Sequence, residues 1–364
     1  MKASDLFAAE EIERARSYHR PLYRALGLNV ILELGVLAAI AFGPPGDWLA
    51  GATGGSWWAR TIEWVALVAG VETLVRLPLS AWSGWLYEGR WGFSTQTLRG
   101  WFWDKVKGLV AGVAVSSLGL LLLLGAVREW PGPWPAVAAP GAALFVLVLS
   151  LLAPLLFERL FNRFVPLPDA ELAGELRELS RQAGVPVRTI LVSDASRRTR
   201  KHNAYVSGLG PTRRLVIFDT LLADVPREEL RGVVAHELGH RRYRHMAFGT
   251  ALAMAGAAIA VLVVWGVLSW RGPDDPRAVP LVLLTFSVLE LAALPFGSWV
   301  SRRWERSADR FALELTGDGA ALEQMHRRLA LANLADLDPP PLLYALLFTH
   351  PTPPERIAAA RMGS

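Results

Sequence analysis

Long apolar stretches, separated by short polar segments, fill the first part of the chain and return after residue 245. Six of these stretches approach the roughly 20 residues that a helix needs to cross a membrane. They are residues 25–42, 62–79, 109–127, 137–156, 246–270 and 279–299. The third, fourth and fifth are nearly free of charge, whereas acidic or basic side chains interrupt the other three. This pattern predicts a mainly α, polytopic helical membrane protein with about six spanning helices.

The segment between the fourth and fifth apolar stretches has a different pattern. In residues 170–184 the leucines recur every three or four positions, as on one face of an amphipathic helix. Residues 187–194 and 213–222 are rich in branched side chains and are typical of strands, with a shorter strand expected within residues 204–210. A second helix is expected after Pro226, where two glutamates would favour its first turn. This alternation predicts a small α/β domain.

These patterns divide the chain into four parts. We expect a membrane region with four spanning helices, then the α/β domain, then two further spanning helices, and finally a C-terminal helical part. The expected boundaries of these parts are 1–157, 158–245, 246–300 and 301–364.

The basic residues indicate how the chain is oriented in the membrane. Lysines and arginines gather in the N-terminal segment and in the loop after the second apolar stretch, and they are sparse in the alternate loops. Cytoplasmic loops carry such an excess, so with six spans both termini and the α/β domain are expected on the cytoplasmic side. The net charge of +5 is then explained by anchoring to anionic membrane lipid, and we predict no nucleic-acid partner.

Composition supports the membrane assignment and narrows the chemistry. Hydrophobic residues make up 52% of the 364 positions, and many of the 15 tryptophans lie at the ends of apolar stretches, as in an interfacial belt. The chain contains no cysteine, which excludes disulfides, thiolate metal ligands and cysteine nucleophiles. Any metal must therefore be held by histidine, aspartate or glutamate.

The second helix of the α/β domain carries the sequence HELGH at residues 236–240. His236 and His240 are four positions apart and share one helical face, so both imidazoles can reach one metal ion. Glu237 is then placed to take a proton from an attacking water, as in metal-dependent peptide hydrolysis. The combination predicts a hydrolase site for Zn²⁺, with one ion per chain.

A zinc hydrolase needs a third protein ligand and a position left open for water. A histidine six residues after His240 would be one solution, but that position is Met246, and His245 is expected on another face. Glu305 offers an alternative, because Asp309 follows it at the spacing of one helical turn. One carboxylate can bind the metal while the other accepts the free N–H of a ligand histidine. The competing interpretation is a salt-bridged surface helix among the neighbouring arginines.

Several further motifs extend along the chain. After HELGH comes SRRWERSAD at residues 301–309. The other segments are RARSYHRPLY (14–23), EGRWGFSTQTLRGWFWD (88–104), LLAPLLFERLFNRFVPLPD (151–169), HNAYVSGLGPTRRLVIFDTLL (202–222) and THPTPPERI (349–357). Together they resemble the type I CAAX prenyl endopeptidase family, the integral-membrane gluzincin proteases. This resemblance covers almost the whole chain and implies a gluzincin-type zinc protease domain on the cytoplasmic side.

The resemblance also implies roles for individual residues around the metal. Glu305 would be the third zinc ligand, and Asp309 would support the ligands from behind. His350 and Arg356 match a histidine and an arginine beside the family's site, which bind substrate or stabilise the oxyanion. Glu237 would act as the general base.

The substrate side is implied in the same way. Asn203, in the sequence HNAY with Ala204 and Tyr205, is similar to a family asparagine on an edge strand that receives the substrate backbone. The substrate would be a peptide or protein that is prenylated at its C-terminus. The abundance of Ala, Arg, Leu and Gly indicates a bacterial source, so the expected location is the inner membrane with a cytoplasmic active site.

Other functions are compatible with parts of the pattern. A membrane quality-control metalloprotease that acts on non-prenylated membrane proteins would use the same chemistry. A scaffold protein is disfavoured by the intact set of ligands and base. A metal transporter is disfavoured because HELGH precedes the fifth apolar stretch instead of lying within one.

Four charged residues within the apolar stretches allow two interpretations. Glu33, Glu72, Arg76 and Glu290 are costly if they face lipid. They either line a water-filled chamber, as the resemblance implies, or pair with one another, for instance Glu72 with Arg76.

Overall fold

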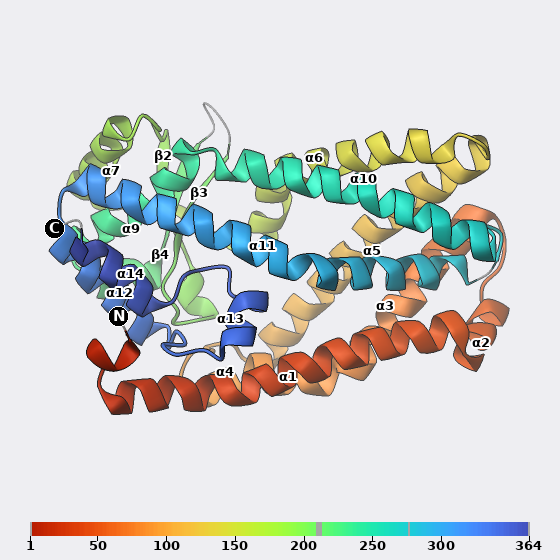
Figure 1. Cartoon of the computed structure of the whole chain (residues 1–364), viewed down its shortest axis with the longest axis horizontal. Helices are drawn as coiled ribbons and strands as arrows, with labels where there is room; N and C mark the ends of the chain where they lie inside the picture. Colours follow the sequence, from red (N-terminus) through yellow and green to blue (C-terminus); the bar gives the residue numbers. More distant parts are fainter. Residues whose placement is uncertain (1, 209–212, 276, 363–364) are drawn as a thin grey trace.

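The computed structural model describes residues 2–208, 213–275 and 277–362. Six long helices in these ranges run along the molecule, and the sheet and most of the shorter helices gather at one end (Figure 1). The long helices are α1 (Ala9–Phe42), α3 (Trp57–Ala81), α5 (Leu98–Glu129), α6 (Trp134–Phe161), α10 (His245–Arg271) and α11 (Ala278–Thr316). Each of the six predicted apolar stretches lies within one of them, in the expected order.

The long helices pack in cyclic order. Each contacts the next in the series α1, α3, α5, α6, α10 and α11, and α11 returns to α1. An apolar cluster fills the end where α5 turns into α6 and α10 turns into α11, and it includes Trp64, Leu124, Val264 and Val282. This end of the bundle is therefore a packed core.

Five helices in the described ranges are long and apolar enough to cross a membrane, namely α1, α5, α6, α10 and α11. The remaining long helix, α3, has 25 residues and takes its place in the same ring. It carries four charged side chains, which make its composition less apolar than that of its neighbours. Two of these side chains, Glu72 and Arg76, are half-buried where α3 packs between α1 and α5.

The charges of α3 are paired with α1. The Nη1 atom of Arg76 lies 3.0 Å from Glu33 Oε2, and its Nε donates to Asn29 Oδ1 at 2.9 Å. Ser287 of α11 donates to the other oxygen of Glu33 at 3.2 Å. Arg76 and Glu33 therefore pair between two of the long helices. The ion-pair partner of Arg76 is Glu33 and not Glu72, which precedes Arg76 by four positions.

A four-stranded sheet lies at the end of the molecule opposite the apolar cluster of the long helices (Figure 1). Its strands are β1 (Phe164–Pro166), β2 (Thr189–Ser193), β3 (Ala204–Ser207) and β4 (Arg214–Phe218), in the order β1-β2-β4-β3. The central strands β2 and β4 are parallel, and the edge strands β1 and β3 are antiparallel to their neighbours. Sequence analysis did not predict β1, whose last residue is a proline, a residue tolerated at a sheet edge.

The strand expected at residues 213–222 is shorter in the structure. It ends at Phe218, because Asp219 begins the short helix α8 (Asp219–Asp224). Residues 209–212, which belong to the motif at 202–222 and include the end of the strand expected within 204–210, lie outside the described residues.

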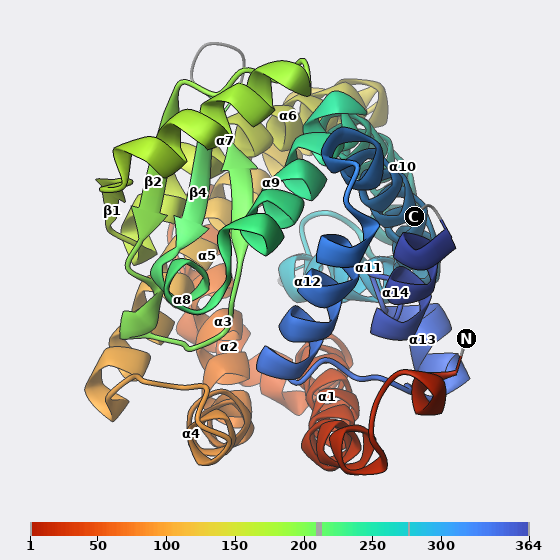
Figure 2. The same ribbon diagram turned by 90° about the vertical axis from the view of Figure 1, so that its left-hand side faces the viewer.

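The helices α7 (Ala170–Gln182) and α9 (Arg227–Arg242) pack beside this sheet (Figure 2). The amphipathic pattern of α7 places Leu176 in a core with Leu215 and Ile217 of β4, and all three are fully buried. Leu238 of α9 completes the same core. The sheet thereby fixes the position and rotation of α9.

The C-terminal part folds back over the same end. α11 continues without a break from the sixth apolar stretch to Thr316, so one helix carries both that stretch and the motif SRRWERSAD. Behind it come α12 (Gly319–Ala332), α13 (Pro341–Leu347) and α14 (Pro353–Met362). The remaining short elements are α2 (Pro44–Ala52), a π-helical turn (Trp82–Tyr87), α4 (Glu88–Arg90) and the 3₁₀ turns Ala3–Asp5 and Ala195–Arg197.

Candidate active site

The HELGH sequence occupies the C-terminal half of α9. Val234 and Leu238 on this helix are fully buried against the sheet. His236 and His240, which lie on a neighbouring face of α9, are thereby turned toward α11. The spacing of the two histidines puts both imidazoles on one face of α9, and the packing of α9 on the sheet points that face toward α11.

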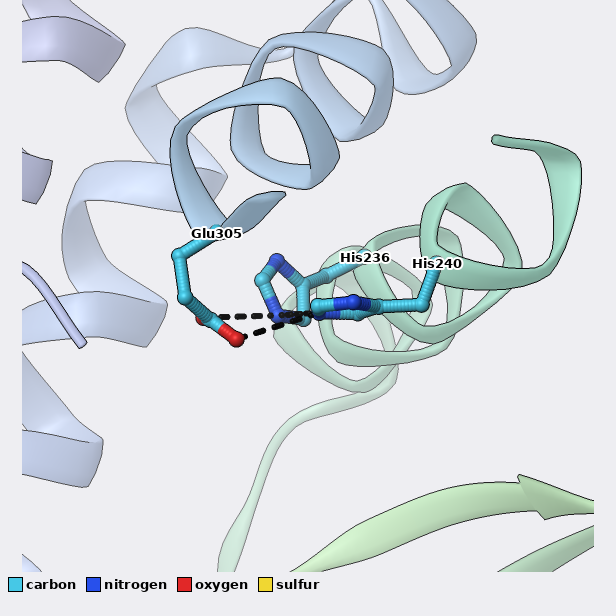
Figure 3. Close-up of side chains that lie close together, drawn as sticks. All are labelled: His236, His240 and Glu305. Carbon is cyan, nitrogen blue, oxygen red and sulfur yellow. Dashed lines mark hydrogen bonds and ion pairs between the residues drawn. The ribbon is translucent and has the colours of Figure 1, made fainter. Parts of the chain in front are cut away.

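α11 brings Glu305 to the two histidines (Figure 3). The Nε2 atoms of His236 and His240 lie 3.1 Å apart. Glu305 Oε1 lies 3.2 Å from His240 Nε2, and its Oε2 lies 3.4 Å from His236 Nε2. The three side chains from two helices thus converge on one point, although 65 positions separate Glu305 from His240 in sequence.

These distances fit a tetrahedral metal ion. Bonds of about 2.0–2.1 Å from a tetrahedral ion place neighbouring ligand atoms about 3.3 Å apart. Each of the three residues offers one ligand atom, and these atoms all lie within 4.8 Å of one another. Among the described residues, His236, His240 and Glu305 form the group of histidine and acidic side chains that could hold a metal. Glu305 Oε2 is buried without a hydrogen-bond partner, which is costly unless a cation satisfies it.

A carboxylate and a guanidinium lie directly behind His236. Asp309 Oδ1 lies 2.8 Å from His236 Nδ1, so it can accept that N–H and leave Nε2 free to bind a metal. Arg356 of α14 donates to both oxygens of Asp309, at 2.6 and 2.8 Å. Burial opposes the charged form of His236, but the carboxylates of Asp309 and Glu305 outweigh it and raise its pKa to about 10. The two carboxylates therefore favour positive charge at His236, and the Arg356 guanidinium partly opposes them.

Glu237 lines the same cleft as His236. Burial raises the pKa of the Glu237 carboxyl, while the adjacent His236 and His240 act against this shift. A carboxylate with a raised pKa is a stronger base than an ordinary glutamate. This is the property that a proton acceptor at this position needs.

The cleft is a cavity of about 440 Å³. One wall comes from the start of β3, with Asn203 and Ala204, and another from the segment between α13 and α14, with His350. His350 Nε2 lies 3.4 Å from Glu305 Oε1, and Nδ1 of the same ring contacts Thr349 Oγ1 at 2.9 Å. The structure thus brings His350 and Arg356 to the predicted site together with the three candidate ligands.

A family model described as peptidase family M48 matches residues 166–363, which include every residue of this site. The chain belongs to peptidase family M48. A second family model, described as the CAAX prenyl protease N-terminal region with five membrane helices, matches residues 2–163. This M48 member is therefore a membrane metalloendopeptidase that acts on peptides or proteins, and the predicted fold class is confirmed.

Relatives of this M48 peptidase cover most of its length. It is 31% identical to an uncharacterized metalloprotease, YhfN, of Bacillus subtilis over 83% of this chain and 73% of that protein. It is 28% identical to the CAAX prenyl protease 1 of Saccharomyces cerevisiae over 83% of this chain and 72% of that protein. The crystal structure of S. mikatae Ste24p superposes with a TM-score of 0.80 at 25% identity, covering 98% of this chain and 90% of that one.

His245, which was expected on another face, is not among the three candidate ligands, but its ring contacts His240 from the start of the next helix. His245 Nδ1 lies 3.1 Å from His240 Nδ1. A continuous helix would have rotated His245 away, but α9 ends at Arg242, and Arg244 adopts a left-handed conformation with φ 58°. α10 then starts at His245 and returns it to the metal centre of the M48 peptidase. A left-handed arginine is uncommon, and the sequence gives no sign of it.

Gly239 sets the distance between the two helices that hold the metal centre. A Cβ at this position would lie 3.1 Å from the Ala308 Cα and 3.2 Å from the Ala308 oxygen, both backbone atoms of α11. Ala308 is one turn from Glu305 on the same helix. Only glycine therefore allows this close approach without displacing α11.

Replacing Gly239 with alanine should displace α11 by a few tenths of an ångström and move Glu305 away from the histidines. We expect metal affinity to fall and turnover to drop about tenfold, since catalysis is sensitive to small displacements. Gly174→Ala in α7 is the matched control, because a Cβ there meets nothing within 4 Å. That variant should keep full activity and gain about 0.5–1 kcal/mol in free energy of unfolding. Equal activity of the Gly239→Ala enzyme would contradict this account.

Proposed function

We propose that this M48 peptidase is a zinc endopeptidase of the CAAX prenyl protease type. His236, His240 and Glu305 would hold one Zn²⁺, and Glu237 would be the general base. The observation that carries the proposal is the set of distances from 3.1 to 3.4 Å among the three candidate ligands, which matches the edges of a tetrahedral site. Nitrogen and carboxylate donors in this combination are those of catalytic zinc sites.

Zinc, when bound, would supply Lewis-acid chemistry, polarising the scissile carbonyl and acidifying the attacking water. Glu237 takes the proton of that water and delivers it to the leaving amine. Asp309 holds the ring of His236 in the tautomer that presents Nε2, and Arg356 holds Asp309 by two hydrogen bonds. We propose that His350 donates from Nε2 to the developing oxyanion.

The free edge of β3 is suited to hold the substrate backbone. The Phe218 N–H donates to Asn203 O, so in this antiparallel ladder the next residue, Ala204, turns its N–H and C=O away from β4. Val206 faces outward in the same way, but Arg241 donates to its oxygen at 3.1 Å from Nε. We propose that a substrate strand pairs with Ala204 and that Arg241 ends the available edge.

The neighbours of Ala204 would contribute in different ways. Asn203 is exposed in the cleft, where its amide can contact the substrate. The backbone N–H and C=O of Tyr205 point toward β4, opposite to those of Ala204. The Tyr205 ring packs edge-on against Phe218, with ring centroids 6.5 Å apart. We propose that Tyr205 fixes the strand while Asn203 and Ala204 meet the substrate.

The prenylated substrate and the location are part of the same proposal. The family model matching residues 2–163 and the relatives named CAAX prenyl protease 1 support a substrate prenylated at its C-terminus. The clusters of Lys and Arg support a bacterial inner-membrane enzyme with its active site and termini on the cytoplasmic side, in contact with anionic lipid. No specific observation favours the quality-control alternative.

The proposal is tested with the full chain purified in detergent. A farnesylated CAAX peptide and its unmodified twin are incubated with the enzyme, with and without a zinc chelator. We expect chelator-sensitive release of the C-terminal tripeptide from the farnesylated peptide and at most slow cleavage of the twin. Equal cleavage of both peptides would remove the prenyl specificity and support the quality-control alternative. Cleavage that resists every chelator would contradict the zinc mechanism.

His350 gives a separate test of the oxyanion assignment. His350→Ala should lower kcat by about 10²–10³-fold, the usual loss when one oxyanion donor is removed. KM and zinc content should change little, because the side chain is not among the proposed ligands. His350→Gln, which can place an N–H near the same point, should recover part of the rate. An alanine variant with a normal kcat would exclude His350 from catalysis.

A further inference from the structure

We infer that His245 is a positioning residue for the metal ligand His240, acting as the acceptor of its Nδ1–H. The inference rests on the proposed assignment of His240 as a zinc ligand through Nε2. It assigns His245 a role that the HELGH motif does not contain, since His245 lies five positions beyond the motif's last residue.

The hydrogen-bond directions along this chain of side chains follow from the chemistry of His240. A histidine that binds a metal through Nε2 carries its proton on Nδ1, and that Nδ1 lies 3.1 Å from His245 Nδ1. His245 Nδ1 must then be the acceptor, which places the remaining proton of the neutral ring on Nε2. This Nε2 lies 3.2 Å from Ser307 Oγ, and Ser307 Oγ donates to the Trp304 oxygen at 2.7 Å. Every donor in this chain has an acceptor, and the chain ends on a backbone carbonyl.

The surroundings hold His245 in this orientation. Its ring stacks on Trp304 with centroids 5.2 Å apart and an angle of 11° between the planes. On the same ring Tyr243 stacks at 5.8 Å, and the residue is only 6% exposed. Trp304 and Ser307 flank Glu305 on α11, so the helix that supplies one ligand also holds the partner of another.

The two ligand histidines therefore have different supports. Asp309, a carboxylate, faces Nδ1 of His236, whereas a neutral imidazole faces Nδ1 of His240. Glu237, Glu305 and Asp309 already contribute three carboxylates to the centre. A neutral acceptor at His240 fixes the tautomer and ring direction without adding a fourth negative charge to a buried site.

Two substitutions at position 245 separate this role from simple packing. His245→Phe keeps an aromatic ring for Trp304 and Tyr243 but has no acceptor. His245→Asn loses the ring, yet its side-chain oxygen can occupy the place of Nδ1 and accept from His240. We expect zinc affinity, measured by chelator competition on the full chain in detergent, to fall about 10–100-fold in His245→Phe. In His245→Asn it should fall only a few-fold.

A packing role predicts the reverse order, with phenylalanine tolerated and asparagine damaging. The inference is overturned if His245→Phe binds zinc as tightly as the unmodified enzyme, or if His245→Asn is as weak as His245→Phe. His240→Ala is measured alongside. If that variant keeps full zinc affinity, the proposed ligand set itself is wrong. If it loses zinc while His245→Phe does not, only the role of His245 is refuted.

Discussion

Replacing Glu237 with glutamine should remove almost all peptide cleavage while the metal stays bound. Glutamine has nearly the same shape as glutamate but cannot take a proton from the attacking water. Loss of a general base costs about 10²–10⁴-fold in rate. Because Glu237 is not among the three converging ligands, zinc content should not change.

The rate is measured with the farnesylated CAAX peptide and the metal by elemental analysis of the same preparation. Glu228→Gln provides the matched control, since Glu228 is an exposed glutamate in the first turn of the same helix. The control should cleave and bind metal like the unmodified enzyme. Near-normal turnover in Glu237→Gln would refute its role as the base.

Replacing Glu305 with alanine should empty the site. Two histidines remain on α9, and the third ligand, which closes the tetrahedron from α11, is lost. The loss of affinity should exceed the about 10–100-fold effect of removing a group behind a ligand, because a direct bond to the metal disappears. Activity should be lost together with the metal.

Zinc per chain after dialysis against a weak chelator measures this effect. Glu314→Ala is the control, because Glu314 is an exposed glutamate further along the same helix. It should retain one zinc per chain. Full zinc occupancy in Glu305→Ala would show that the third ligand lies elsewhere.

The path of α11 connects the membrane region to this chemistry. The same helix contributes to the packed apolar end of the ring, where Val279 and Val282 are buried, and carries Glu305 more than twenty positions later. At Gly239 of α9 it approaches so closely that an added Cβ would lie 3.1 Å from the Ala308 Cα. The position of one metal ligand is therefore set by contacts at the helix crossing and by packing inside the bundle.

The sequence alone determined the features that depend on local spacing. The apolar stretches predicted all six long helices, because a spanning helix must satisfy its backbone internally and cover itself with apolar side chains. The spacing of His236 and His240, and of Glu305 and Asp309, predicted shared helical faces, because neighbours on one face of a helix are three or four positions apart. These relations need no knowledge of the rest of the fold.

Only the tertiary structure decided which residues from different elements meet. Arg76 pairs with Glu33 across two helices, and Arg356 of α14 donates to Asp309. The sequence contains several carboxylates with which either arginine could have paired. The contact of His245 with His240 was not predicted, because one left-handed residue, Arg244, redirects the chain between α9 and α10. Helical periodicity describes positions along one element, whereas such contacts depend on backbone dihedrals at turns and on core packing, which the pattern of residue types does not specify.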